Sequence, residues 1–231
     1  MDSLLPPRLT PLVAPVRERR TVTAQAGDVF HFSALIRGRV FTALMTQASL
    51  RKQGIAARAS MSADERDAAS NVIAERVIRA PWFQRATYIA CYLPAPTEVN
   101  TWTIISRAWR MKKRVFAPVL EKNRRMQFRE LLPETDLLPK QFGLLEPLNG
   151  ETVTARMLDL VLTPLVVFDD DGQRIGMGGG YFDTTFSFLK HRRAYLHPKL
   201  VGLAFACQRV ERIVPNPWDI RLCSVITERY D

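Results

Sequence analysis

The sequence predicts an α/β protein, built as a three-layer α/β/α domain with a mostly parallel central sheet. Three observations support this prediction. Short apolar segments with strand character alternate along the chain with segments of helical periodicity. One of these segments, residues 158–168, is almost wholly apolar, as expected of a strand that is buried on both faces. Hydrophobic residues make up 47% of the 231 residues, which is enough for a real core.

Residues 1–40 differ from the rest of the chain and are expected to form a flexible extension to a single domain over residues 41–231. Four prolines in the first fifteen residues oppose an amphipathic helix. The extension also lacks the long apolar segment of a secretory signal. No apolar run elsewhere approaches the ~20 residues of a membrane span, so no membrane association is expected.

Helices are expected at four places in the domain. The first runs from Phe41 to Ala59, where Arg51, Lys52 and Arg58 are expected to share part of one face. Ser62 and Glu65 have the spacing of a capping box, which predicts a second helix from about residue 63 to residue 78. The other two helices cover residues 101–111, with Asn100 as a candidate cap, and the segment that begins at Tyr181.

Strands are expected between these helices. They cover residues 86–93, 114–119, 158–168, 200–205 and 222–226, with an edge hairpin around residues 126–128. In a parallel sheet, ligands gather at the carboxyl ends of the strands. Glu98, a glycine-rich loop and the loop of Gln208 each follow a predicted strand, so we expect a binding site at that edge.

The glycine-rich loop is the densest local signal, because four of the eleven glycines fall within Gly176–Gly180. Glycine is costly to order, so such density indicates a backbone that bends sharply or approaches a ligand closely. Converging N–H groups, with a helix amino terminus at Tyr181, would bind an anion such as phosphate. Arg174 could add a charge-assisted contact, and Asp183 could hold a metal ion. A glycine-rich turn without a ligand is the alternative.

Two familiar phosphate loops do not match. No Gly-Lys-Ser/Thr ending is present, and the third glycine of a dinucleotide fingerprint would fall at Tyr181. The formal charge of +10 invites a nucleic-acid partner, but basic residues are spread along the chain, which favours an anionic small molecule. The three cysteines show no metal or disulfide spacing, which suits a reducing cytoplasm, and Cys91 and Cys223 are expected in the core.

Several motifs in order resemble the 5-formyltetrahydrofolate cyclo-ligase family. The most specific is Gly-Gln-Arg-Ile-Gly-Met-Gly-Gly-Gly-Tyr-Phe-Asp over residues 172–183, preceded by Leu-Asp-Leu-Val-Leu-Thr-Pro at residues 158–164. The others are Leu50-Arg-Lys with Arg58 and Met61-Ser62, Leu93 through Glu98-Val-Asn-Thr101, and Val201-Gly-Leu-Ala-Phe with Gln208, Trp218-Asp219-Ile and Val225-Ile-Thr227. The resemblance covers residues 47 to 227.

The resemblance implies an enzyme with a fold like that of the NagB, RpiA and CoA-transferase proteins. The reaction it implies is the cyclisation of 5-formyltetrahydrofolate to 5,10-methenyltetrahydrofolate, with ATP as co-substrate, Mg²⁺, and release of ADP and phosphate. The folate is a small-molecule substrate, and nucleic acid is not expected as a partner. A cytoplasmic monomer or weak homodimer is expected. Such phosphoryl transfer depends on positioning and charge neutralisation more than on a protein nucleophile.

The resemblance also implies roles for individual residues. It implies no catalytic nucleophile and gives electrostatic support to Arg174. The implied ATP-binding residues are Arg51, Arg174, Ile175, Gly176, Met177, Gly178, Gly179, Gly180, Tyr181 and Phe182. The implied folate-binding residues are Leu93, Glu98, Met177, Gly178, Gly179, Gly180 and Tyr181, and the implied Mg²⁺ ligands are Asp183 and Asp219.

Two departures from the family pattern bear on whether the chain is catalytic. Gln47 stands where relatives often carry Lys, and Thr184 follows Asp183 where many carry Arg. These departures keep open a non-catalytic nucleotide- or folate-binding protein on the same fold. A third hypothesis, nucleic-acid association through the basic surface and residues 1–40, predicts binding that weakens steeply with salt.

Overall fold

A computed structural model describes residues 46–140, 143–191 and 197–229. Its centre is a seven-stranded sheet in the order β11-β10-β7-β1-β2-β3-β6. The strands are β1 (Tyr88–Cys91), β2 (Arg114–Leu120), β3 (Met126–Glu130), β6 (Thr152–Val153), β7 (Leu160–Pro164), β10 (Lys199–Leu203) and β11 (Ser224–Ile226). The five strands from β11 to β2 are mutually parallel, whereas β3 and β6 add antiparallel pairs at one end. The predicted mostly parallel α/β sheet is therefore confirmed.

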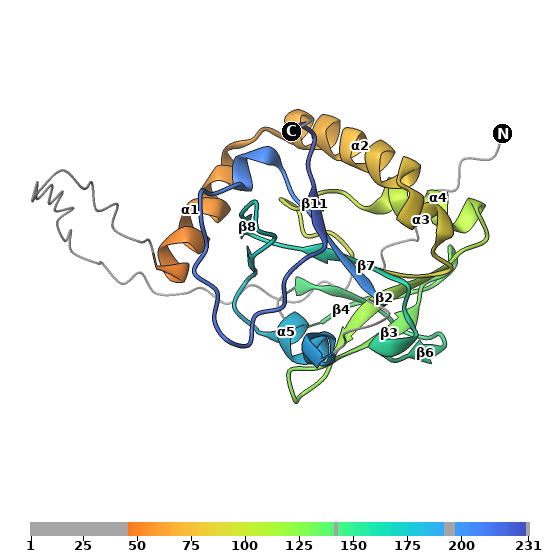
Figure 1. The fold of residues 1–231 in the computed structure, drawn as a ribbon. Coiled ribbons are helices and arrows are strands. Elements are labelled where there is room, and N and C mark those ends of the chain that lie inside the picture. The colour runs from red at the N-terminus through yellow and green to blue at the C-terminus, as the bar shows by residue number, and fades with distance from the viewer. Residues whose placement is uncertain (1–45, 141–142, 192–196, 230–231) are drawn as a thin grey trace, which may run out of the picture.

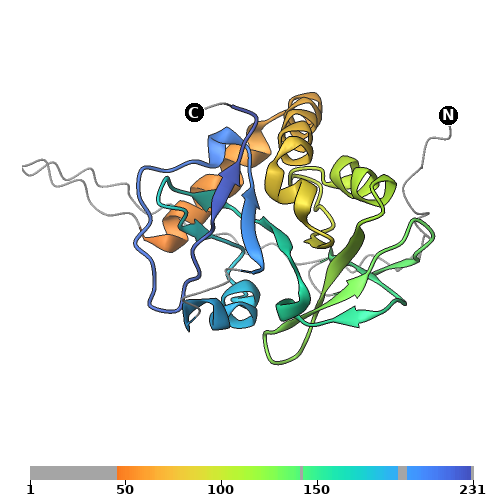
Figure 2. The same ribbon diagram turned by 45° about the vertical axis from the view of Figure 1, so that its right-hand side comes forward.

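Helices cover one face of this sheet thickly and the other face thinly (Figures 1 and 2). The thick layer contains α2 (Ala63–Arg79), α3 (Pro81–Arg85) and α4 (Trp102–Arg110). The thin layer contains α5 (Tyr181–Thr185) and the 3₁₀ turns η2 (Ala155–Met157) and η3 (Ser187–His191). Alternate residues along each strand enter different core clusters, as expected of a sheet buried on both faces: Ile89 and Cys91 pack with α2 and α4, and Ala90 packs with Phe186.

Helix α2 begins where the capping box predicted. The Ser62 Oγ accepts from the Glu65 N–H at 3.2 Å, and the Glu65 carboxylate accepts from the Ser62 N–H at 2.7 Å. Helix α4 uses both of its flanking polar residues. Asn100 Oδ1 accepts from the Trp102 N–H, while the Thr101 hydroxyl donates to the Tyr92 carbonyl at 2.8 Å. The structure thus ties the start of α4 to the end of β1.

Helix α1 (Gln47–Ser60) lies apart from these layers, against the connections that leave the sheet. Its buried positions are Leu50, Gly54 and Arg58, spaced four residues apart on one side. An added Cβ on Gly54 would lie 2.4 Å from Val167 Cγ1 and 2.6 Å from the Val166 carbonyl oxygen. Only glycine allows this close approach. The predicted start of α1 at Phe41 lies outside the described residues.

The segment 158–168 is not one strand, which corrects the prediction made from its continuous apolar character. Strand β7 ends at Pro164, and the chain then leaves the sheet. Strand β8 (Val167–Phe168) pairs instead with β9 (Arg174–Ile175) as a separate hairpin. Gln208 makes this exit possible, because its Nε2 donates to the Leu165 and Val166 carbonyls at 3.0 and 2.8 Å. A second small hairpin joins β4 (Leu137–Pro139) to β5 (Leu145–Pro147).

The remaining predictions can be compared with the described residues. The five predicted strand regions each contain a strand, and the hairpin around residues 126–128 is the antiparallel β2–β3 pair. Cys91 is buried, as predicted, but Cys223 is exposed, which corrects that prediction: it precedes β11, which is an edge strand of the sheet that the described residues form. The predicted extension over residues 1–40 lies outside the described residues. No helix in the described part of the chain is long and apolar enough to cross a membrane.

Candidate active site at the carboxyl ends of the strands

The candidate site residues follow β1, β7 and β10, which run parallel side by side in the sheet. Their carboxyl ends therefore meet at one edge, where the Glu98 loop, the β8–β9 hairpin and the 3₁₀ turn η4 (Ala206–Gln208) emerge. Helix α1 contacts β8, β9 and η4 and so crosses this edge. The loops in which the sequence predicted site residues emerge at this one edge, while the crossing of α1 is a feature of the tertiary structure.

The glycine loop bends through conformations that side chains rarely adopt. Gly178 has φ of +97° and Gly180 has φ of +71°, and Gly180 is the residue directly before α5. Within the described residues, the N–H groups of Gly176, Met177, Gly178 and Gly179 make no hydrogen bond. They remain available to an anion. Helix α5 begins at Tyr181 as predicted, but it has only five residues, so its dipole contributes less than a long helix would.

Arg51 lies beneath this loop. Its Nε donates to the Gly176 carbonyl at 2.8 Å, and its Cζ lies 3.6 Å from the point where a Cβ on Gly178 would be. Its terminal amino groups make no hydrogen bond within the described residues, so they can reach a ligand. Lys52, in contrast, is exposed on the side of α1 that faces away from the buried positions.

Arg174 is directed inward, toward the protein. Its side chain is buried, and one terminal nitrogen donates to the Ile220 carbonyl. The other donates to Asp183 Oδ1 at 3.0 Å, and the guanidinium lies 5.7 Å from the centre of the Phe182 ring. Arg174 thus holds α5 against the Ile220 segment. Its geometry makes it a residue that orients Asp183, because its terminal nitrogens already donate to protein acceptors.

Asp183 and Asp219, the two predicted metal ligands, belong to neighbouring segments. Asp183 Oδ1 accepts from the Ile220 N–H at 3.0 Å, so the residue that follows Asp219 is held directly by Asp183. Asp219 Oδ2 accepts from the Asn216 N–H at 2.7 Å. In the described chain, Asp183 Oδ2 and Asp219 Oδ1 make no hydrogen bond. No group of three His, Cys, Asp or Glu side chains with metal-binding geometry occurs among the described residues.

Gln47, one of the two departures from the family pattern, connects α1 to this segment. Its Nε2 donates to the Val214 carbonyl at 3.1 Å and to Asp219 Oδ2 at 3.5 Å. A neutral amide therefore occupies a place beside the carboxylate of Asp219. Thr184, the other departure, lies half-buried in α5, and its N–H donates to the Gly180 carbonyl.

Glu98 and Leu93 lie in the loop after β1. Leu93 is 6% exposed and belongs to the core, whereas the Glu98 side chain is 13% exposed. Glu98 Oε2 accepts from the Ala95 N–H at 3.1 Å, which closes the turn, and Oε1 lies 3.5 Å from a terminal nitrogen of Arg58. This ion pair links the last turn of α1 to the loop. The sequence spacing did not predict this ion pair, because forty residues separate Arg58 from Glu98.

Burial also raises the pKa of two side chains, Cys91 at the end of β1 and Tyr92 directly after it. Desolvation raises the pKa of the Cys91 thiol to about 12, because a thiolate would have no water around it. Desolvation, followed by the charge of Glu98, raises the pKa of the Tyr92 hydroxyl, which donates to the Val99 carbonyl at 3.1 Å. Both groups are therefore neutral at ordinary pH, and neither is suited to act as a nucleophile or base.

The other predicted residues differ in exposure. Met177 is 67% exposed at the tip of the loop, Tyr181 and Phe182 are half-buried, and Ile175 is buried against α1. Trp218 is 64% exposed beside Asp219. Ile175 thus supports the loop from below, while Met177 and the backbone around it face outward.

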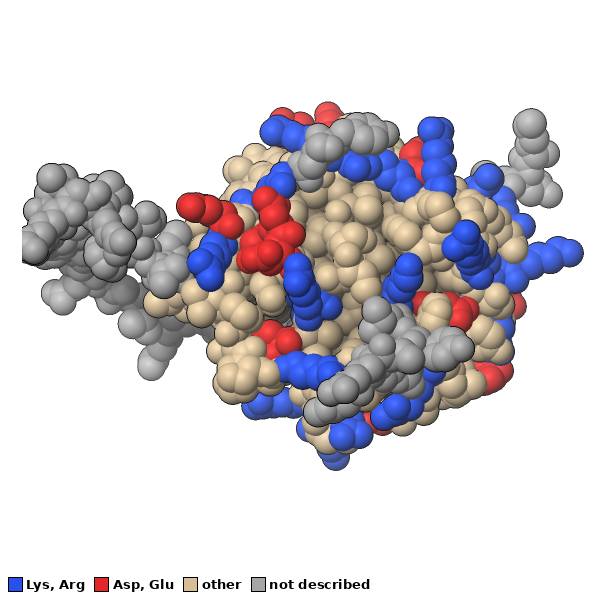
Figure 3. Space-filling view, in the orientation of Figure 1, with Lys and Arg blue, Asp and Glu red and all other residues tan. Residues whose placement is uncertain are grey.

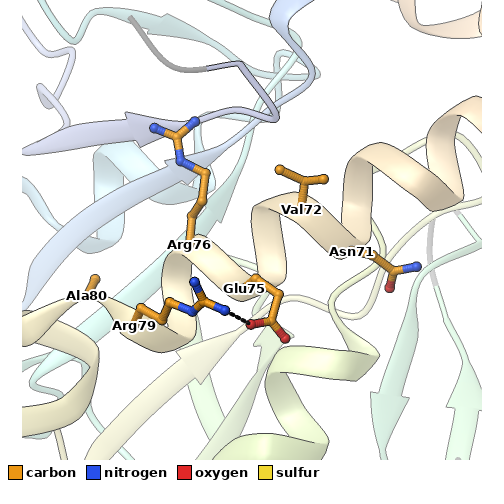
Figure 4. A pocket seen from close by; sticks show the side chains of 6 residues that line it. All are labelled: Asn71, Val72, Glu75, Arg76, Arg79 and Ala80. Atoms are coloured by element: carbon orange, nitrogen blue, oxygen red, sulfur yellow. Dashed lines mark hydrogen bonds and ion pairs between the residues drawn. The ribbon is translucent and has the colours of Figure 1, made fainter.

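Two hollows in the described part of the protein lie away from the predicted site residues. One of about 490 Å³ is on the outer side of α2, lined by Asn71, Val72, Glu75, Arg76, Arg79 and Ala80 (Figure 4). Another of about 330 Å³ includes Trp82, Asp159 and Lys199 at the amino ends of the strands. Neither includes a predicted site residue, so we place the candidate site by its chemistry. Figure 3 shows Lys and Arg spread over one face and interleaved with Asp and Glu, without a continuous basic surface there.

Comparisons with known proteins identify the family to which the chain is similar. Residues 44–228 match the sequence profile of the 5-formyltetrahydrofolate cyclo-ligase family. The chain is 33% identical over 173 residues to the 5-formyltetrahydrofolate cyclo-ligase of Haemophilus influenzae, which covers 73% of this chain and 90% of the relative. It is 32% identical over 174 residues to that of Escherichia coli, covering 74% and 93%. The NMR structure of Aquifex aeolicus 5,10-methenyltetrahydrofolate synthetase superposes with a TM-score of 0.69 at 27% identity, covering 80% of this chain and 91% of that one.

Proposed function

The chain belongs to the 5-formyltetrahydrofolate cyclo-ligase family, and on that premise we propose that it uses ATP and Mg²⁺ to convert 5-formyltetrahydrofolate to 5,10-methenyltetrahydrofolate. The observation that carries this proposal in the structure is the glycine loop with Arg51 beneath it. N–H groups of the loop and the terminal amino groups of Arg51 make no hydrogen bond within the described residues, and a polyphosphate requires such donors.

ATP is proposed to lie along the loop. Arg51 would donate to phosphate oxygens through its terminal amino groups, while its Nε keeps the loop in position through Gly176. The loop from Arg174 to Phe182 would follow the nucleotide. The exposed stretch from Met177 to Gly180 is the part that the phosphates can approach closely, because three of its four residues lack a side chain.

The folate is proposed to bind between the loop and Glu98. Glu98 Oε1 can accept hydrogen bonds from the N–H groups of the pterin ring, and Leu93 supplies an apolar neighbour in the core beside it. Tyr181 offers a ring and a hydroxyl on the other side. The formyl group would then lie against the glycines, where the absence of side chains leaves room for its approach to ATP.

The residues present fit a magnesium ion. Asp183 and Asp219 each keep one carboxylate oxygen without a hydrogen bond within the described residues, and the Asp183–Ile220 bond holds their segments together. Mg²⁺ is commonly bound by one or two carboxylates together with substrate phosphates. When bound, the ion would neutralise charge on the phosphate oxygens.

The reaction needs no nucleophile from the protein. The formyl oxygen attacks the γ-phosphorus of ATP, and ADP leaves. N10 of the folate then attacks the activated carbon, gives up its proton, and displaces phosphate to close the ring. In this sequence the chain positions two substrates and stabilises charge, which is how phosphoryl transfer is usually accelerated.

The test is an absorbance assay for the methenyl product with purified protein, ATP, Mg²⁺ and 5-formyltetrahydrofolate. The expected result is turnover that requires ATP and releases ADP in equal amounts. Binding of ATP and folate without ADP release would instead identify a non-catalytic binding protein.

Two further experiments test the other proposals. Gel filtration of the same sample tests the proposed monomer or weak homodimer, and localisation of a tagged chain tests the proposed cytoplasmic location.

A further inference from the structure

Arg58 is a charged residue in the core that the proposed mechanism does not use. It lies in the last turn of α1 with 6% of its surface exposed. Arginine is rarely buried to this extent unless its charge is paired. Among the described residues, its one ionic partner is Glu98, at 3.5 Å, and its Nε makes no hydrogen bond. The protein therefore buries a guanidinium that it satisfies only in part.

The loop that carries Glu98 is braced on the protein side. The Tyr92 hydroxyl donates to the Val99 carbonyl at 3.1 Å, and the Glu98 N–H donates to the Ala95 carbonyl at 2.9 Å. Glu98 Oε2 is used by the turn, through the Ala95 N–H. The free oxygen, Oε1, is the one that faces Arg58.

The distance between the two side chains matters. Charge-assisted hydrogen bonds between nitrogen and a carboxylate are typically about 2.7–2.9 Å. At 3.5 Å, Arg58 attracts Glu98 Oε1 but does not form such a bond with it. Oε1 therefore keeps its capacity to accept hydrogen bonds from a ligand.

We propose that Arg58 is a positioning residue of the folate subsite, which fixes the position of the Glu98 carboxylate for a ligand with adjacent N–H donors. This inference rests on the proposed folate role of Glu98. It also gives α1 a second task. Arg51 near its start meets the glycine loop, and Arg58 near its end meets the folate loop, so one helix aligns the two substrates.

The test compares Arg58→Gln, Arg58→Lys and Glu98→Gln with wild-type protein in steady-state kinetics. We expect Arg58→Gln to raise the KM for 5-formyltetrahydrofolate by about 10- to 100-fold, the usual effect of removing a partner that orients a ligand-binding group. The KM for ATP should stay within about 2-fold, because Arg51 and the loop are untouched. Arg58→Lys, which keeps the charge, should recover part of the loss.

A double variant distinguishes positioning from a purely structural role. If Arg58 acts through Glu98, Arg58→Gln combined with Glu98→Gln should be little worse than Glu98→Gln alone, whereas independent effects would multiply. Arg79→Gln, at an exposed arginine in the last turn of α2 with a surface partner in Glu75, is the matched control and should change neither KM. Equal rises in both KM values, or multiplying losses, would overturn the inference.

Failure of the proposed function is recognised separately, because wild-type protein would then show no turnover. In that case, titration of 5-formyltetrahydrofolate alone into each variant still measures folate affinity. Weaker binding by Arg58→Gln with an unchanged melting temperature supports the positioning role. Unchanged affinity, or weaker binding seen only together with unfolding, contradicts it.

Discussion

At the scale of single residues, the side chains of the candidate site are held by specific neighbours. Arg51 holds the glycine loop, Arg174 holds Asp183, and Arg58 faces Glu98. The three arginines thus fix parts of the site, and Arg51 is also proposed to contact ATP. The two aspartates differ in the same respect, because Asp183 has a buried cationic partner, whereas Asp219 has no ionic partner among the described residues.

Asp219→Asn should remove activity without unfolding the protein. The amide oxygen of asparagine can accept the hydrogen bond that Asp219 accepts from the Asn216 N–H. The substitution, however, removes the negative charge that is proposed to face Mg²⁺. We expect kcat to fall by about 100-fold or more, in line with the loss of one electrostatic contact to a transition state. Kinetics across a Mg²⁺ series, with a thermal melt of each sample, measure both quantities. A fully active variant would exclude Asp219 as a ligand.

Asp183→Asn should behave differently, because it also leaves Arg174 without its carboxylate. The Arg174 side chain is 5% exposed and that of Asp183 is 23% exposed, so solvent screens the pair only in part. We expect a loss of about 2 kcal/mol in the free energy of unfolding, below the full effect of breaking a buried pair. Urea unfolding beside Asp219→Asn gives the comparison. Equal stability of the two variants would show that the Arg174 contact contributes little.

Two glycine substitutions separate backbone strain from space for a ligand. A Cβ on Gly176 or Gly180 would meet nothing within 4 Å, but only Gly180 has a left-handed φ, at +71°. Gly180→Ala should therefore cost about 1 kcal/mol of stability. Gly176→Ala should leave stability unchanged and lower kcat/KM for ATP by about 10-fold or more, because a small displacement of bound groups costs much of the rate. An unchanged kcat/KM would show that phosphates do not approach Gly176.

At the scale of elements, α1 is the part on which the site depends most. It crosses the carboxyl edge of the sheet, and its contacts reach β8, β9 and η4. The crossing is possible because Gly54 lets the helix backbone approach Val166 and Val167. The exit of the chain after β7 is equally specific, since the Gln208 amide satisfies two carbonyls there.

Gly54→Ala should destabilise the protein although alanine is the better helix former. The new methyl group would overlap Val167 and the Val166 carbonyl, at a cost of about 1–3 kcal/mol that exceeds the ~1 kcal/mol gained in helix propensity. Displacement of α1 should also raise the KM for ATP through Arg51. Gln53→Ala, at the exposed neighbouring position, is the control for urea unfolding and kinetics. A stabilised Gly54→Ala protein would show that α1 packs less closely than described.

At the scale of the whole molecule, the sheet is a continuous support whose centre excludes water. Cys91 lies in β1, the strand between β7 and β2, and is 1% exposed, whereas Cys207 and Cys223 are exposed. Partial burial raises the pKa of the Cys207 thiol as well. The three cysteines therefore lie at different depths in the fold, Cys91 in the buried centre and Cys207 and Cys223 at the surface.

Alkylation should label Cys223 and Cys207 in the native protein and spare Cys91 until global unfolding. Burial raises the Cys91 pKa from 9.0 to about 12, so the unfolded chain loses this proton at lower pH than the folded chain. The contribution of this thiol to the free energy of unfolding is fully present below pH 9.0 and is lost as pH rises toward 12. Iodoacetamide labelling near neutral pH, followed by peptide mapping, provides the test. Rapid native labelling of Cys91 would contradict the described core.

The sequence by itself determined the α/β class, the five strand regions that form the parallel part of the sheet and the capping box of α2, and it predicted a dense glycine loop after one of these strands. These features depend on local patterns, such as apolar periodicity, capping spacing and glycine density, which act within a few residues. The tertiary structure alone decided that the segment 158–168 divides into two strands, that Arg174 turns inward to Asp183, and that Arg58 meets Glu98. Each of these depends on a partner that is distant in the chain, such as Gln208 for the exit of β7. Distant partners are set by packing, and no local spacing records them.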